Sequence, residues 1–181
     1  MPIDLSRKPI LDAIYRCMQE DPSIILFGEG MRAKARYDYP LLLENFGDRV
    51  YTGPIAEAGM VNMALGASVT GLRPVVDLIF NDLLLRAMDE ILNHVAKIHI
   101  MSGGKLHAKM VIKTEFDQYF NAESGSRWDY LFAVPPPPNN ILAPELRVAK
   151  PRTVKESVDM MYEALHYDGP TLFFEDRWLE G

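Results

Sequence analysis

Residues 53–80, GPIAEAGMVNMALGASVTGLRPVVDLIF, contain a helix and the strand that follows it, and they decide the class of fold. The helix is expected over residues 58–70, and PVVDLIF (74–80) is an apolar run of strand length. A short strand, RVYTGP (49–54), precedes the helix. FNDLLLRAMDEILNHVAKIHIMSGG (80–104) follows, and its polar stripe and two closing glycines predict a long amphipathic helix. Strands and helices therefore alternate across residues 53–104.

The alternation extends to both sides of this stretch. A first helix is expected with Ser6 as its N-cap and Pro9 in its first turn. Its apolar face consists of Ile10, Ile14, Cys17 and Met18. Other strands are expected at residues 24–27, 109–114 and 171–175, and other helices at residues 39–46 and after the capping box Thr153-x-x-Glu156. This order predicts an α/β fold, a three-layer sandwich with a mainly parallel sheet covered on both faces, as a single domain over residues 1–181.

Ligands of such sheets bind beyond the carboxyl ends of the strands. Glu29, Glu57, Phe80 and Glu115 lie at or just after predicted strand ends, so they are the first candidates for a site. Residues 115–145, which include PPPPNN at 135–140, form a long irregular region. A loop of that length in a compact domain is usually functional or mobile.

Composition limits the class of protein. The formal net charge of −6 and the pI near 5.2 argue against nucleic acid or an anionic membrane as the main partner. No stretch approaches the roughly 20 apolar residues of a membrane span, and the N-terminus lacks the pattern of a signal peptide. Cys17, the single cysteine, fits a reducing cytoplasm, and its place on the apolar face of the first helix favours core packing over catalysis.

Glu57 is the most informative single residue. It lies among Pro, Ile, Ala and Gly, with few neighbours to pair with it, and such a carboxylate is suited to proton chemistry. The alternative is a helix N-terminal carboxylate that only stabilises the fold. The sequence has no GxGxxG or GxxxxGK[ST] phosphate loop and no GxSxG elbow. Its four histidines show no metal-ligand spacing, so no metal site is expected in this chain.

The PIAEAG run and the pattern AxDxIxNxxAKxxxMSGG resemble one family. It is the pyrimidine-binding domain of transketolase-like thiamine diphosphate enzymes, and the chain is most similar to the beta subunit of pyruvate-type 2-oxo acid dehydrogenases without its C-terminal domain. In that family the glutamate of the motif hydrogen-bonds the pyrimidine ring and moves a proton on and off the ring nitrogen. The resemblance implies that Glu57 is catalytic. It also implies that Glu29, Ile55, Phe80 and Leu83, together with Glu57, contact thiamine diphosphate.

Two departures accompany the resemblance. Leu83 stands where the family stacks an aromatic ring on the pyrimidine, with Phe80 one helical turn away. The family's glycine-rich loop with its HSQ segment is replaced by EFDQYFNAESGSRWDY (115–130) and the proline run. Substrate, reaction type or activity itself is therefore expected to differ from the family pattern.

The chain lacks the GDG-to-Asn motif that binds magnesium and the diphosphate. The resemblance thus implies a separate diphosphate-binding, alpha-type subunit that holds Mg²⁺, and an α2β2 assembly acting on a 2-oxo acid or a ketose. Small residues on the helix at 58–70 imply that another backbone or a cofactor approaches it closely, or that it packs tightly inside one subunit. A catalytically degenerate structural or regulatory partner and an unrelated α/β small-molecule binder remain the alternatives.

Overall fold

The computed structural model describes residues 9–31, 39–116 and 145–176, and these form a six-stranded, all-parallel sheet. The strand order is β2-β1-β3-β4-β6-β5. The strands are β1 (Ile24–Glu29), β2 (Val50–Gly53), β3 (Arg73–Phe80), β4 (Val111–Phe116), β5 (Arg147–Ala149) and β6 (Thr171–Asp176). The main helices are α1 (Pro9–Glu20), α2 (Tyr39–Phe46), α3 (Glu57–Val69) and α6 (Val154–His166). The predicted α/β class with a parallel sheet is confirmed.

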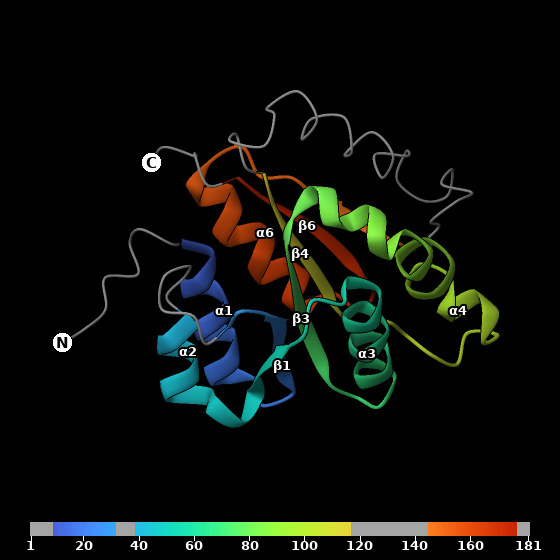
Figure 1. The fold of residues 1–181 in the computed structure, drawn as a ribbon, viewed down its shortest axis with the longest axis horizontal. Helices are drawn as coiled ribbons and strands as arrows, with labels where there is room; N and C mark the ends of the chain where they lie inside the picture. Colours follow the sequence, from blue (N-terminus) through green and yellow to red (C-terminus); the bar gives the residue numbers. More distant parts are fainter. Residues whose placement is uncertain (1–8, 32–38, 117–144, 177–181) are drawn as a thin grey trace.

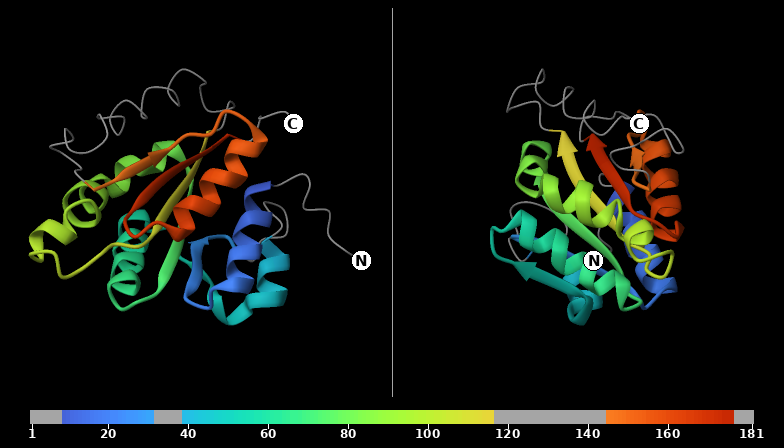
Figure 2. Two further views of the ribbon diagram at one scale, coloured as in Figure 1. Left: turned by 180° about the vertical axis from the view of Figure 1, so that it is seen from behind. Right: turned by 90° about the vertical axis from the view of Figure 1, so that its right-hand side faces the viewer.

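Helices cover both faces of the sheet, as the three-layer prediction requires (Figures 1 and 2). Helices α1, α2 and α6 pack on one face, and α3 and the segment after β3 pack on the other. Parallel strands need such crossovers, because each connection must return to the opposite end of the sheet. None of the helices in the described ranges is long and apolar enough to span a membrane. The extent of the domain over residues 1–181 stays a prediction.

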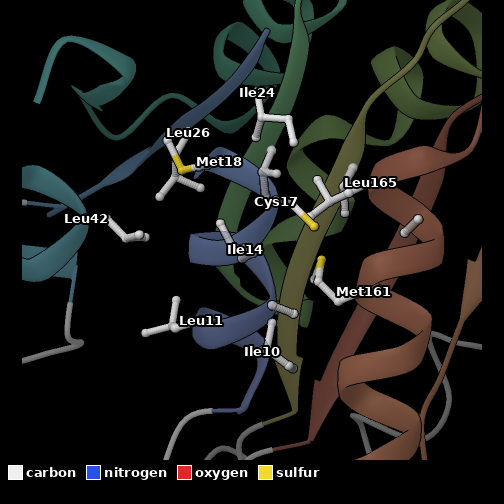
Figure 3. Close-up of a cluster of buried hydrophobic side chains, with 14 of the residues drawn as sticks. Ile10, Leu11, Ile14, Cys17, Met18, Ile24, Leu26, Leu42, Met161 and Leu165 are labelled. Carbon is white, nitrogen blue, oxygen red and sulfur yellow. The ribbon is translucent and has the colours of Figure 1, made fainter. Parts of the chain in front are cut away.

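The first core lies between α1, α6 and the sheet, where apolar side chains of the two helices meet (Figure 3). Cys17 is fully buried there, and burial raises the pKa of its thiol to about 11. A thiol of this kind is a poor nucleophile, so the prediction that Cys17 packs in the core is confirmed. Helix α6 begins with the predicted capping box: the backbone N–H of Glu156 donates to Thr153 Oγ1 at 3.1 Å. The predicted N-cap Ser6 lies outside the described residues.

The second core joins the opposite face of the sheet to α3 and to residues 81–101. The single long helix predicted for that segment is wrong. Residues Asn81–Ala87 form the 3₁₀-helix η3, Glu90–Val95 form the π-helix η4, and Ile98–Met101 form the short helix α4. The buried apolar positions are Leu84, Ala87, Ile91, Val95 and Ala96. A spacing of three or four residues satisfies α, 3₁₀ and π windings equally, so periodicity did not reveal the breaks.

The end of β4 also differs from the sequence-based boundary. β4 continues through Glu115 and Phe116, which had been placed in the irregular region. Strand pairing explains the extension, because both residues are in register with Glu175 and Asp176 of β6. The paired glycines Gly103 and Gly104 do end the segment as predicted, with φ of +66° and +80°.

The order of the strands creates a switch point between β1 and β3. From β1 the chain goes outward to β2 through α2, and from β2 it returns to β3 through α3 on the opposite face. Connections that leave neighbouring strands in opposite directions open a crevice at their carboxyl ends. Glu29 and Phe80 are the last residues of these two strands.

Candidate active site

Glu57 is the first residue of α3, the helix that returns the chain from β2 to β3. It is only 2% exposed although it follows the exposed Ile55 by two residues. The helix N-terminus favours a negative charge, because the first backbone N–H groups of a helix lack helical partners. The predicted site residue Glu57 is therefore a buried carboxylate at the start of a helix, next to the switch point.

Glu57 is not the unpaired carboxylate that its sequence neighbours suggested. Arg86 Nε donates to Glu57 Oε2 at 3.0 Å, and the Arg86 side chain is 67% exposed. Arg86 belongs to η3, which packs against α3. The pair joins residues 29 positions apart, so the local sequence around Glu57 could not indicate it. An exposed cation thus closes over a buried anion.

The other predicted site residues lie around the same switch point with different exposure. Glu29 and Phe80, at the carboxyl ends of β1 and β3, are half-buried, and so is Leu83 on η3. Glu29 lies in register with Gly53, four residues before Glu57. Ile55 is 70% exposed. Residues 117–144, with most of the segment that replaces the HSQ loop, lie outside the described residues.

Of a buried charged network on the other face of the sheet, the sequence indicated only Glu115, which therefore lies apart from Glu57. Lys113 Nζ lies 3.2 Å from Asp77 Oδ2, 3.0 Å from Glu115 Oε1 and 2.5 Å from Glu175 Oε2. Tyr39 OH donates to Asp77 Oδ2. The signal was present, because an acid or a lysine interrupts the apolar runs PVVDLIF, MVIKTEF and TLFFED.

Burial and mutual charge shift the protonation of this network. Burial alone would lower the pKa of Lys113, but the carboxylates of Asp77 and Glu175 raise it well above its usual range. Burial raises the pKa of Glu115 to about 8, although Lys113 opposes the shift and Glu175 adds to it. Burial, together with the Asp77 carboxylate, also raises the pKa of Tyr39 well above its usual range. At neutral pH the lysine is therefore charged, and Glu115 is mostly protonated.

Fold and site together define an α/β protein with a buried carboxylate at the switch point of a parallel sheet. The comparison with protein families gives the class directly: residues 6–179 match the family described as "Transketolase, pyrimidine binding domain". The chain belongs to this family.

Curated relatives of the chain are described as beta subunits. The pyruvate dehydrogenase E1 component subunit beta of Rickettsia bellii (strain RML369-C) is 30% identical over 179 residues, covering 97% of this chain and 53% of that protein. The acetoin:2,6-dichlorophenolindophenol oxidoreductase subunit beta of Bacillus subtilis (strain 168) is 28% identical over 186 residues, covering 93% and 52%. The chain thus spans about half the length of the curated relatives it matches.

Solved structures share the fold. A split-gene transketolase, described as an inactive beta4 tetramer, superposes with a TM-score of 0.71 at 18% identity, covering 97% of this chain and 52% of that one. A thiamine diphosphate-dependent 4-hydroxybenzoylformate decarboxylase from Rhodococcus jostii RHA1 superposes with a TM-score of 0.59 at 16% identity, covering 93% and 30%. The transketolase-like fold predicted from the sequence is confirmed.

Proposed function

We propose that this chain is the pyrimidine-binding subunit of a split thiamine diphosphate-dependent enzyme that acts on a 2-oxo acid or a ketose. Glu57 is its catalytic residue, and Glu29, Ile55, Phe80 and Leu83 join it around the cofactor. A separate alpha-type subunit holds the diphosphate and Mg²⁺. The observation that carries the proposal is the burial of Glu57 at the start of α3, beside the carboxyl ends of β1 and β3.

The residues present fit a pyrimidine ring. A heterocycle with ring nitrogens needs one polar group that exchanges a proton and apolar surface for its faces. Glu57 supplies the polar group, and the half-buried Phe80 and Leu83 supply apolar surface beyond the strand ends. Because Arg86 is exposed, its side chain can swing toward solvent and open the Glu57 carboxylate without rearranging the core.

The cofactor and the side chains of this protein would therefore supply different parts of the chemistry. Thiamine diphosphate, when bound, supplies the electron sink for cleavage next to a carbonyl group. Glu57 holds or releases a proton at the ring nitrogen of the pyrimidine, and its fixed place at a helix start orients that exchange. Phe80 and Leu83 exclude water from the ring faces, although leucine offers less area than an aromatic side chain.

An exposed face of α3 supports the proposal that the chain requires a partner subunit. Gly59, Asn62, Met63 and Gly66 are exposed along one side of the helix. An added Cβ at Gly66 would meet nothing within 4 Å, and at Gly59 only Ala56 Cβ at 3.6 Å. Tight packing inside the chain therefore does not explain these two glycines. A helix face with two bare glycines beside one asparagine and one methionine suits close approach by a second helix, and we place it inside an α2β2 assembly.

The same proposal covers location and other partners. We propose a cytoplasmic enzyme that needs neither nucleic acid nor a membrane, in keeping with its net charge of −6.

A second candidate is a subunit that keeps the fold and stabilises a catalytic partner without acting itself. The pairing of Arg86 with Glu57 favours this candidate, because the carboxylate expected to exchange a proton already has a cationic partner. Leu83 at the aromatic position favours it as well.

The test is to co-express the chain with candidate subunits that carry a GDG motif followed by an asparagine. Thiamine diphosphate with Mg²⁺ is then titrated into the chain alone and into the purified pair, by isothermal calorimetry. The proposal predicts weak or no binding to the chain alone and saturable binding to the pair. A chain that stays monomeric with every candidate, and that binds no thiamine diphosphate, contradicts it.

A further inference from the structure

Asp77 connects the buried charged network to the end of β3. The alternation of side chains along β3 places Val75 in the first core and Val76 and Leu78 in the second, so Asp77 lies on the face covered by α1, α2 and α6. This is the face opposite to α3 and Glu57. Both oxygens of the Asp77 carboxylate accept hydrogen bonds there, and they accept them from different parts of the molecule.

One oxygen is held by the network and the other by the strand end. Asp77 Oδ2 accepts from Tyr39 OH and from Lys113 Nζ, the latter at 3.2 Å. Asp77 Oδ1 accepts from the backbone N–H of Ile79 at 2.8 Å. The side chain is 1% exposed, so no water competes for these bonds. The Asp77 carboxylate therefore joins Tyr39 and Lys113 to a backbone amide two residues further along its own strand. We call these hydrogen bonds to the two carboxylate oxygens the clasp.

The clasped amide belongs to a strained residue. Ile79 has φ of +69°, a region that β-branched residues rarely adopt, and it is the only non-glycine residue with positive φ in the described ranges. The register between β3 and β4 shifts between Asp77 and Phe80. A strained backbone persists only where its surroundings determine it, and the bond from Asp77 is the specific polar contact that does so here.

The bulge decides where the next segment goes. Phe80, the residue after Ile79, is the N-cap of η3, and η3 carries Leu83 and Arg86 against α3. Arg86 in turn bonds Glu57. A change in the backbone at Ile79 therefore shifts the segment that covers the Glu57 carboxylate. Gly28 on the neighbouring strand leaves room chiefly for the Met31 side chain, since a Cβ there would lie 1.9 Å from Met31 Cε and 3.3 Å from Asp77 Cβ.

We propose that Asp77 is a positioning residue for the site at Glu57: through its bond to the Ile79 amide it fixes the β3 bulge and, with it, the placement of Phe80, Leu83 and Arg86. Lys113 and Tyr39 hold the Asp77 carboxylate in place through Oδ2, on the face of the sheet opposite to Glu57. The part that concerns cofactor binding rests on the proposed function. The part that concerns Arg86 and Glu57 does not.

Asp77→Asn tests the clasp with almost no change of shape. An amide has one acceptor oxygen, whereas the two sides of the clasp each require an acceptor, because Lys113, Tyr39 and the Ile79 amide are all donors. The asparagine oxygen should turn to the charged Lys113, which can only donate and whose hydrogen bond is the stronger one, so the bond to the Ile79 amide is lost. The readouts in the full chain are hydrogen exchange of the Ile79 amide and the ¹H–¹⁵N resonance of Arg86 Nε, measured by NMR without cofactor.

The expected result is exchange at Ile79 that is at least about tenfold faster and an Arg86 Nε proton that exchanges with solvent, since one hydrogen bond accounts for a change of that size. In the assembled pair, thiamine diphosphate should bind about tenfold more weakly for the same reason. Met161→Ala, in the first core but outside the network, is the control for general destabilisation. It should leave both NMR signals as in the wild type.

Equal exchange at Ile79 and an unchanged Arg86 signal in Asp77→Asn would overturn the proposal. So would losses that Met161→Ala reproduces at a matched free energy of unfolding. If Asp77→Asn does not fold, Tyr39→Phe takes its place, because it removes one donor to Oδ2 and keeps the aromatic ring. Unchanged Ile79 exchange in that variant would also overturn the proposal. Both NMR signals are measured without cofactor, so they test the proposal even if the proposed function is wrong.

Discussion

Arg86 Nε donates to Glu57 Oε2 at 3.0 Å, so a cation that is two-thirds exposed shields a carboxylate that is almost fully buried. The pair is asymmetric: the Arg86 side chain is already mostly in water and loses little by moving further out, whereas the Glu57 side chain is only 3% exposed. A ligand that approaches Glu57 must therefore compete with Arg86 or bind beside it.

Arg86→Met should strengthen cofactor binding by the assembled pair. The substitution keeps much of the apolar stem but removes the competing cation, and a partly exposed ion pair is worth about 1 kcal/mol, or roughly fivefold in the dissociation constant. Calorimetric titration of thiamine diphosphate measures the change. Arg147→Met, which breaks the exposed pair with Glu163, serves as the matched control and should have no effect. Weaker binding in Arg86→Met would mean that the guanidinium contributes to the bound state.

Lys113→Met should destabilise the chain strongly. Lys113 is the one cation among the three acidic side chains of the network, and removing one partner of a buried pair typically costs about 3–5 kcal/mol. Urea denaturation followed by circular dichroism gives the free energy of unfolding. Lys155→Met is the control, because that side chain is 86% exposed and its replacement should leave the stability essentially unchanged. Similar values for the two variants would contradict the described network.

Glu115 should make stability fall as pH rises. Its pKa is raised from 4.5 to about 8 in the folded chain, so the folded state retains a proton that the unfolded state has already lost. This contribution is fully present below pH 4.5, falls by up to about 1.4 kcal/mol per pH unit and is lost by pH 8. Glu115→Gln keeps the neutral form at every pH, so its stability relative to the wild type should grow between pH 5 and pH 8. Glu163→Gln, at an exposed position, should retain the wild-type slope.

Substitutions at Gly66, an exposed glycine of α3, should separate effects on folding from effects on assembly. Gly66→Ala should stabilise the isolated chain by about 0.5–1 kcal/mol, because alanine is the better helix former and its Cβ meets nothing within 4 Å. Gly66→Leu should also leave the chain folded but prevent close approach of a second helix. Thermal unfolding and analytical ultracentrifugation with the partner subunit measure the two effects. An intact assembly with Gly66→Leu would place the interface elsewhere.

Much of the fold could be predicted from the sequence, because alternating apolar runs and helical periodicity are local signals. The strand at residues 24–27, the capping box at Thr153 and the core position of Cys17 all follow from such signals. The windings of residues 81–101 do not, since 3₁₀ and π turns bury the same positions as an α-helix.

The site was predicted only in part, for a different physical reason. Glu57 stands out in its own motif, but its partner Arg86 and the clasp of Asp77 on Ile79 depend on how three strands and a bulge come together. Residues 29 or 36 positions apart, as in Arg86–Glu57 and Lys113–Asp77, leave no local pattern. The apolar neighbours of Glu57 along the chain therefore gave a wrong impression of its isolation.

The most direct test of the central claim is the turnover of the assembled pair with Glu57→Gln, assayed with pyruvate, other 2-oxo acids and a ketose. Glutamine keeps the size and one acceptor of the side chain but cannot exchange the proton. We expect turnover to fall by at least about a hundredfold, the usual contribution of general acid–base catalysis, while thiamine diphosphate still binds within about tenfold of the wild type. A Glu57→Gln pair that turns over substrate at the wild-type rate would contradict the account.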